Sequence, residues 1–277
     1  MGPLGATMGD VNGELANLIT LVAWGNAWLQ GREPEPIDFE RLNTTYRFAR
    51  EVEFVVPGVP PEPPGVVTTV AEWLACLRAL GTRRLGLEAA SYAGALPQRL
   101  AAAFAGHDFG HIAGVGTVTS AWKPTREVVA PQASDEKIWQ LRLTGTPGQG
   151  EPPVPSELEL ARAHDELDAS LAAMGNFCER EGVPLWGERF AAAIALGAED
   201  DPVIPFHPDL VPPSTEPAVR RLLATASAGW VFGGMGSWND VSFPEPEQGD
   251  VAEWLTAQLY DKTVAAIVAA ANRTGLR

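Results

Sequence analysis

Two of the chain's four histidines lie close together in residues 106–111, GHDFGH. Imidazole nitrogens beside a carboxylate suit zinc, iron or nickel, and an i,i+4 pair on one helix would face one ion. The glycines of this segment favour a loop instead, which removes that geometric reason to pair the histidines. We therefore expect either an acid/base or divalent-metal site formed by His107 and His111 and oriented by Asp108, or a structural turn in which the histidines bind backbone groups.

The glycine-rich segment 233–240, GGMGSWND, carries a second set of candidate residues. Three glycines in four positions allow positive φ angles and close approach to a ligand, and consecutive amides there can form an anion-binding nest. No GK[ST] follows, and the dinucleotide fingerprint GxGxxG is absent. The candidate ligand-binding residues are Trp230, Gly234, Gly236, Ser237, Trp238 and Asn239, and the candidate catalytic carboxylate is Asp240. The alternative is a turn before the last helix, held by local hydrogen bonds of Asn239 and Asp240.

Motifs for a nucleophile are weak in this chain. There is no GxSxG elbow, and the two matches to SxxK, at Ser120 and Ser134, are short patterns of low specificity. Cys178 has no histidine close in sequence and no basic helix terminus beside it, so we expect it in the core. The sequence leaves open whether the protein is an enzyme, and it indicates no cofactor beyond a divalent metal ion at the histidines.

The charge balance excludes several classes of partner. The 277 residues include 35 acidic and 20 basic side chains, which give a formal net charge of −15 at pH 7. This charge repels phosphate backbones and anionic lipid, so we expect no nucleic acid and no membrane as a partner. The uncharged run from Leu15 to Gln30 is shorter than the roughly 20 apolar residues that a bilayer requires, and the start of the chain lacks the features of a signal peptide. These features predict a cytoplasmic protein, and the heavy use of Ala, Gly, Pro and Arg is typical of a GC-rich bacterial genome.

Hydrophobic periodicity indicates which elements must position the candidate segments. Two apolar stripes on the first helix predict that it is buried on two faces. Asp10 and Asn12 are the expected start of this helix, and Gly106 is the expected end of the third. Helices are expected at 14–30, 70–80, 96–105, 157–181, 186–197, 216–228 and 251–272, and strands at 45–56, 82–92, 114–129, 137–143 and 229–232.

The order of these elements predicts an α+β fold. We expect a mostly antiparallel sheet in the first half and a largely helical second half packed on it. Residues 1–145 form the α+β half, 146–156 a Gly/Pro-rich linker or loop, and 157–277 the mainly helical half that ends in the glycine-rich loop and a long helix. The alternative to this division is one integrated domain.

Two functional hypotheses follow from these residues. The first is a small-molecule-processing enzyme or ligand-binding protein, with a Trp- and Gly-lined pocket made by segments 106–111 and 233–240. The second is a non-catalytic acidic interaction protein, such as an immunity or antitoxin-type inhibitor of a basic partner. The expected partner is therefore a small organic molecule or a basic protein. A homodimer could form through exposed tryptophans or through the first helix.

Overall fold

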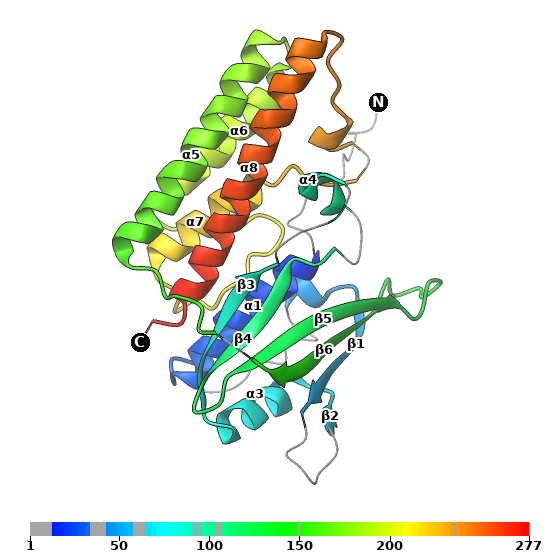
Figure 1. The fold of residues 1–277 in the computed structure, drawn as a ribbon, viewed down its shortest axis with the longest axis vertical. Helices are drawn as coiled ribbons and strands as arrows, with labels where there is room; N and C mark the ends of the chain where they lie inside the picture. Colours follow the sequence, from blue (N-terminus) through cyan, green and yellow to red (C-terminus); the bar gives the residue numbers. More distant parts are fainter. Residues whose placement is uncertain are drawn as a thin grey trace.

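The computed structural model of the protein describes residues 13–33, 43–57, 65–90, 94, 96–103, 107–148, 150–234 and 236–276. The first half of the chain forms a sheet with helices behind it, and the second half forms a helical bundle beside the sheet (Figure 1). This arrangement confirms the predicted α+β fold. One cluster of buried side chains extends through both halves, from Leu15 in the first helix to Ala271 in the last.

The sheet has six strands in the order β2-β1-β6-β5-β4-β3. Their bounds are Ala49–Val56 (β1), Gly65–Val67 (β2), Thr82–Ala89 (β3), Gly110–Gly116 (β4), Ser120–Val128 (β5) and Trp139–Pro147 (β6). Neighbouring strands are antiparallel except β1 and β6, which are parallel. After β1 and β2 the chain reaches the far edge through helix α3 (Val70–Ala79), and it then returns in three antiparallel steps to lie beside β1.

Helices α1 (Gly13–Leu29) and α3 pack against the sheet. α1 contacts β3 and β4, and each residue from Glu14 to Ala27 is buried, which confirms that this helix is buried on two faces. α3 is fixed by Trp73, the ring of which stacks on Phe54 of β1 with 4.7 Å between centroids. The same ring meets Trp122 of β5 edge-on at 5.4 Å, so aromatic contacts connect α3 to the middle of the sheet.

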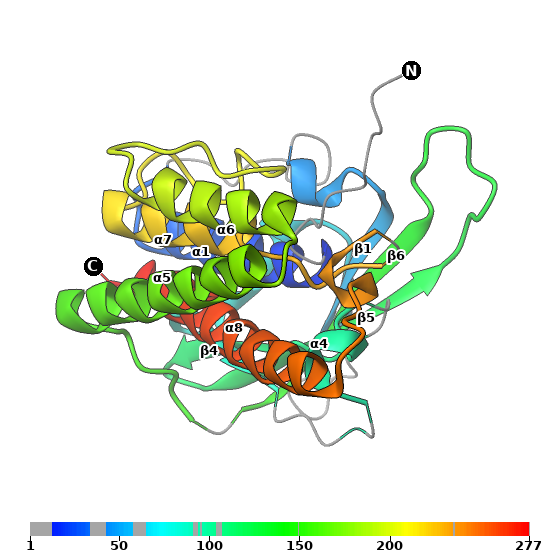
Figure 2. The same ribbon diagram turned by 90° about the horizontal axis from the view of Figure 1, so that it is seen from above.

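The second half contains a bundle of four helices, namely α5 (Glu157–Arg180), α6 (Pro184–Gly197), α7 (Pro217–Ala228) and α8 (Pro246–Arg273). α5 and α7 each contact both α6 and α8, and Figure 2 shows α5 between α6 and α8. α8 also contacts β3 and α1, so it connects the bundle to the sheet. Within the described ranges, no helix is long and apolar enough to cross a membrane.

Several expected elements differ from the structure. β4 begins at Gly110, within the segment expected as a loop, β6 extends to Pro147, and α8 begins at Pro246. The stretch 114–129 contains the end of β4, a turn and β5 rather than one strand. Residues 229–232 belong to none of the six strands, and the carbonyl of Val231 accepts a hydrogen bond from the backbone of Trp238 in the following loop. The third helix, α4, spans only Gln98–Ala101. Its expected end at Gly106 lies outside the described residues, as do Asp10 and Asn12, the expected start of the first helix.

The free edge of β3 is closed by two asparagine side chains. The amide of Asn26, on α1, accepts a hydrogen bond from the Leu85 N–H at 2.7 Å and donates to the Leu85 carbonyl at 3.0 Å. Asn272, on α8, makes the same two bonds with Leu87, at 2.6 and 3.1 Å. Both asparagines are buried. Because helices rather than water face this edge, the side-chain amides replace the strand that would otherwise satisfy its backbone groups.

The Gly/Pro-rich segment between β6 and α5 follows the same edge. The guanidinium of Arg84, on β3, donates to the carbonyl of Pro152 at 2.8 Å. The segment ends in a capping box, in which the Ser156 hydroxyl accepts from the Glu159 N–H and the Glu159 carboxylate accepts from the Ser156 N–H. The expected start of this helix at residue 157 is confirmed.

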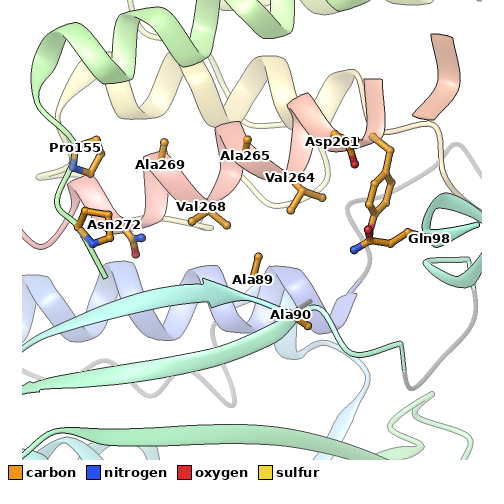
Figure 3. Close-up of a pocket in the computed structure, with 12 residues that line it drawn as sticks. Ala89, Ala90, Gln98, Pro155, Asp261, Val264, Ala265, Val268, Ala269 and Asn272 are labelled. Carbon is orange, nitrogen blue, oxygen red and sulfur yellow. The ribbon is translucent and has the colours of Figure 1, made fainter. Parts of the chain in front are cut away.

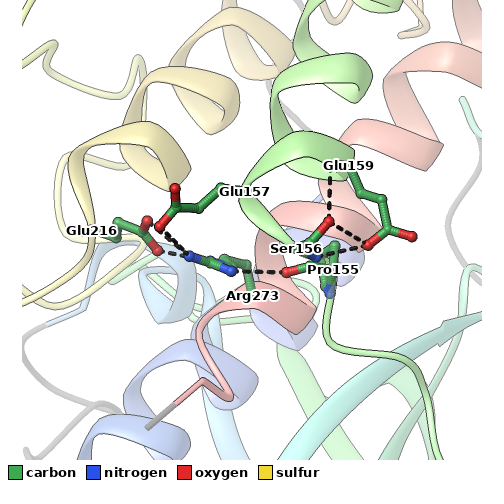
Figure 4. Close-up of polar contacts among 6 residues, drawn as sticks. All are labelled: Pro155, Ser156, Glu157, Glu159, Glu216 and Arg273. Atoms are coloured by element: carbon green, nitrogen blue, oxygen red, sulfur yellow. Dashed lines mark hydrogen bonds and ion pairs between the residues drawn. The ribbon is translucent and has the colours of Figure 1, made fainter.

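Arg273, in the last turn of α8, connects the ends of three helices (Figure 4). Its guanidinium donates to the Glu216 carboxylate at 2.9 and 3.1 Å and to the Pro155 carbonyl at 3.0 Å, and it lies 3.6 Å from Glu157. The hydrogen bonds to Glu216 raise the pKa of Arg273 further. Glu216 and Glu157 stand at the N-terminal ends of α7 and α5, so one cation holds both of these ends against the C-terminal end of α8.

Replacing Asn272 by Ala removes both bonds to Leu87 and leaves a buried N–H and a buried carbonyl without partners. Each of the two unsatisfied groups costs about 1–3 kcal/mol, so the free energy of unfolding should fall by about 2–6 kcal/mol. Asn176→Ala, at an exposed position of α5, is the matched control and should change the free energy of unfolding by less than about 0.5 kcal/mol. Urea unfolding followed by circular dichroism measures both variants, and equal losses would contradict the role of the Asn272 amide.

Candidate functional site

A cavity of about 450 Å³ lies between α8, the end of β3 and α4 (Figure 3). Val264 and Val268 of α8 point toward Ala89 at the end of β3. Gln98 of α4 and Pro155 lie at the two ends of the cavity. The residues of α8 that line the cavity lie on one face of the helix. They are Tyr260, Asp261, Val264, Ala265, Val268, Ala269 and Asn272.

The lining is mainly apolar, with polar groups concentrated near one end. Alanine and valine side chains form most of the surface, and Gln98, Tyr260 and Asp261 supply polar atoms. Asp261 is exposed, and it forms no hydrogen bond or ion pair with any residue in the described part of the chain. The amide of Asn272, near the other end, is already bonded to Leu87. The Asp261 carboxylate is therefore the charged group that a ligand in this cavity can reach.

His107 lies behind the cavity. Its Nε2 atom is 3.5 Å from the hydroxyl of Tyr260, which is buried and lines the cavity. The His107 ring meets Phe109 edge-on, with 4.5 Å between centroids. Burial lowers the pKa of His107, and the charge of the neighbouring Asp108 opposes this shift. At pH 7 the imidazole is therefore neutral, and its Nε2 atom either accepts a hydrogen bond from the Tyr260 hydroxyl or donates one to it, depending on the tautomer.

Buried aromatic rings join the segment 107–111 to the residues before the glycine-rich loop. The centroids of Phe109 and Trp230 are 6.2 Å apart, and Trp230 lies 6.1 Å from Tyr260. Trp230 is fully buried, and its indole N–H donates to the Phe232 carbonyl at 3.2 Å. Segment 107–111 thus packs against Trp230, which precedes the glycine-rich segment 233–240. A ligand-binding role for Trp230 stays a prediction.

Asp108 and His111 have partners different from those of His107. The Asp108 carboxylate accepts a hydrogen bond from the Gly110 N–H at 2.9 Å and so forms a local turn. Gly110 has φ +127°, and a Cβ atom there would collide with the backbone of Glu88, so this turn requires glycine. His111 stands on β4 opposite Glu88 of β3, and its Nε2 atom lies 3.2 Å from the Glu88 carboxylate. The strand register creates this His–Glu pair, which sequence spacing did not indicate.

The glycine-rich loop is closed by hydrogen bonds of its own residues. The Ser237 hydroxyl and the Asn239 side-chain amide both donate to the Gly233 carbonyl, at 2.9 and 3.2 Å. The Asp240 carboxylate accepts from the Gly236 N–H. These bonds are local, as in a structural turn. Catalysis by Asp240 and ligand binding by Gly236, Ser237 and Asn239 stay predictions.

Trp238 anchors this loop to the bundle. Its side chain is 3% exposed, and its indole N–H donates to the Thr256 hydroxyl of α8 at 2.7 Å. On the other side, the Arg99 guanidinium of α4 donates to the Asn239 side-chain carbonyl at 3.2 Å. Gly234 faces open space, since a Cβ atom there would have no neighbour within 4 Å. Ligand binding by Gly234 and Trp238 stays a prediction as well.

A metal site is not assembled in the described ranges. Within them, no group of three or more His, Cys, Asp or Glu residues is arranged to hold an ion. His107 and His111 face Tyr260 and Glu88 respectively. Binding of a divalent metal by these two histidines therefore stays a prediction, and no geometry supports it.

Sequence analysis missed the face of α8 that lines the cavity. Asp261, Val264 and Val268 recur every three to four residues, which is also the pattern of an ordinary core helix. The one available signal is an acidic residue within this mainly apolar row. The space in front of the row arises from Ala89, which is distant in sequence and small.

Comparisons with protein-family models, with curated proteins and with solved structures find no match to this chain.

We expect His107 to titrate below the ordinary histidine pKa of about 6.5, because burial disfavours the imidazolium ion. The unfolded chain then binds a proton at a higher pH than the folded protein does. Protonation of His107 therefore does not change the free energy of unfolding above about pH 6.5. Below that value it lowers this free energy progressively as the pH falls. His107→Gln, which keeps hydrogen-bonding capacity toward Tyr260, should lose this part of the pH dependence.

A two-dimensional NMR titration of the imidazole nitrogens gives the pKa of His107 directly. Urea unfolding of the protein and of His107→Gln at about pH 7.5 and about pH 5.5 gives the linked change in stability. A His107 pKa at or above about 6.5, or the same pH dependence in both proteins, would contradict the effect of burial.

Proposed function

We propose that the protein binds a small, mainly apolar organic molecule with a cationic or hydrogen-bond-donating end in the cavity between α8, β3 and α4. The observation that supports this proposal is the combination of an apolar lining with one unpaired carboxylate, Asp261. The volume of about 450 Å³ lies within the range of about 300–1,000 Å³ that is typical of small-molecule sites. Both the apolar body and the polar end of such a ligand would then meet matching surfaces.

The polar end of the ligand is expected beside Asp261 and Gln98. A carboxylate accepts hydrogen bonds from an ammonium group, and the amide of Gln98 can both donate and accept. The net charge of −15 also favours the approach of a cation over that of an anion. The apolar body would lie along Val264 and Val268, where burial of apolar surface supplies most of the binding free energy.

His107 enters this proposal through Tyr260. The imidazole contacts the Tyr260 hydroxyl, which belongs to a residue of the lining, so His107 can set the orientation of that hydroxyl toward a ligand. If the protein is an enzyme, Tyr260 and Asp261 are the side chains that touch the substrate, and His107 is a positioning residue. His111 and Asp240 contact Glu88 and Gly236 and do not line the cavity, so direct catalysis by either residue would require a ligand bound outside it.

A cytoplasmic location is part of the proposal. Both cysteines, Cys76 and Cys178, are free, which agrees with a reducing compartment. Burial raises the pKa of the Cys178 thiol to about 11, so this thiol is unreactive at neutral pH. Cys178 therefore has a packing role in this proposal.

Native mass spectrometry of gently purified protein should show a bound small molecule, and that molecule, once identified, provides the probe for titration calorimetry. Val264→Phe narrows the cavity and should weaken its binding by at least about tenfold, or about 1.4 kcal/mol. Val251→Phe makes the same substitution at an exposed position of α8 outside the cavity, and it should leave the affinity within about twofold. Asp261→Asn should reduce the affinity for a cationic ligand by a similar factor of about ten.

Equal affinities of Val264→Phe and Val251→Phe would place the ligand elsewhere. If the purified protein carries no small molecule, thermal unfolding in the presence of a panel of apolar amines is the second measurement. A melting temperature that no amine raises in the unmodified protein would contradict the proposed function.

A further inference from the structure

A second concave surface lies between α5 and α6. The turn that joins these two helices is on the part of the bundle remote from the sheet (Figure 1). This groove has a volume of about 590 Å³. Its walls are formed by one face of each helix, with Ala172, Asn176 and Glu179 on α5 and Pro184, Glu188 and Ala191 on α6. None of these residues belongs to the cavity described above.

The floor of the groove is shaped by glycine. Gly175 and Gly187 face each other where the two helices pack, and a Cβ atom at Gly187 would lie 3.5 Å from the Gly175 carbonyl oxygen. Because these residues have no side chains, the surface above them remains hollow and mainly apolar. Ala172 and Ala191, on the two walls, are exposed, so an apolar surface of small residues faces solvent.

The charged residues at the rim of this groove are acidic. Glu179 and Glu188 are exposed, and within the described part of the chain neither forms an ion pair. The neighbouring cations are engaged elsewhere, since Arg180 pairs with Glu181 at 2.7 Å and Arg189 lies over the Trp186 ring at 5.5 Å. The rim therefore has a local negative potential that these cations do not fully neutralise.

An exposed leucine stands where α5 turns into α6, next to Pro184 of the groove. Leu185 is 76% exposed and follows Pro184 in the first turn of α6. The apolar lining of the groove is thus flanked by the exposed carboxylates of Glu179 and Glu188.

We propose that the groove between α5 and α6 binds a basic amphipathic helix of a partner protein. An apolar helix face fits a groove between two helices, and small residues in the floor allow the backbones to approach closely. Lysine or arginine side chains beside that face would reach Glu179 and Glu188. The net charge of −15 accelerates encounter with a basic partner and discourages acidic ones.

A synthetic helical peptide of about 18 residues, with an Ala/Leu row flanked by Lys, is the probe, and its binding is followed by fluorescence polarisation. Ala191→Tyr fills the groove and should weaken binding by at least about tenfold. Ala192→Tyr is the matched control, because Ala192 is also exposed on α6 but does not line the groove, and it should retain the affinity within about twofold. Circular dichroism and the melting temperature verify that both variants are folded.

Charge reversal tests the chemistry of the partner. Glu179→Lys with Glu188→Lys should weaken peptide binding by about tenfold or more and reduce its dependence on salt. Glu247→Lys with Asp250→Lys changes the net charge equally at exposed positions of α8 outside the groove, and it should have an effect of less than about threefold. A peptide in which Glu replaces Lys should bind at least about tenfold more weakly than the basic one.

Three results would overturn the proposal. The first is a dissociation constant above about 1 mM for the basic peptide at low salt. The second is equal binding to Ala191→Tyr and Ala192→Tyr. The third is equal binding of the basic and acidic peptides.

Discussion

The edge of the sheet at β3 ends in side-chain amides rather than in another strand. An amide on an asparagine has the same donor and acceptor as a peptide group, but it reaches the strand only if its helix has the right rotation and distance. Asn26 and Asn272 meet this condition on two different helices at alternate residues of one strand, Leu85 and Leu87. The positions of α1 and α8 relative to the sheet, and therefore the contact between the two halves, depend on these four hydrogen bonds.

The cavity between α8, β3 and α4 also results from the way α8 is held against β3. Asn272 and Arg273 hold the last turn of α8 against β3 and against the ends of α5 and α7. Nearer its start, α8 is held by Trp238 through Thr256. Between these attachments α8 passes over the end of β3, where Ala89 is too small to fill the space in front of Val264 and Val268. A rigid helix above a small residue thus produces a cavity without any mobile element, and the buried pair of Tyr260 and His107 forms the layer beneath it.

The parts of the fold that depend on local pattern could be predicted from the sequence. The two apolar stripes of α1 indicated burial on two faces, and the helix expected from residue 157 is α5. Contacts between distant residues could not be predicted. No sequence feature near Asn272 indicates a contact with Leu87, which precedes it by 185 positions. The same limit applies to the candidate site. The histidine and glycine segments were recognised from composition, whereas the pairing of His107 with Tyr260, 153 residues away, follows only from the packed structure. Residues 229–232 were expected as a strand because a buried apolar run has the same composition in either conformation.

The long distance in sequence between β3 and Asn272 affects the nascent chain during synthesis on the ribosome. Asn26 precedes β3, so its amide is available as soon as that strand emerges. Asn272 follows 185 residues after Leu87, and at 5–20 residues per second this interval is about 10–40 s. During that time the edge at Leu87 has no partner from α8 and can pair with the strands of other nascent chains. The growing chain is thus most exposed to aggregation before α8 is made, at a stage when the finished protein's stability offers no protection.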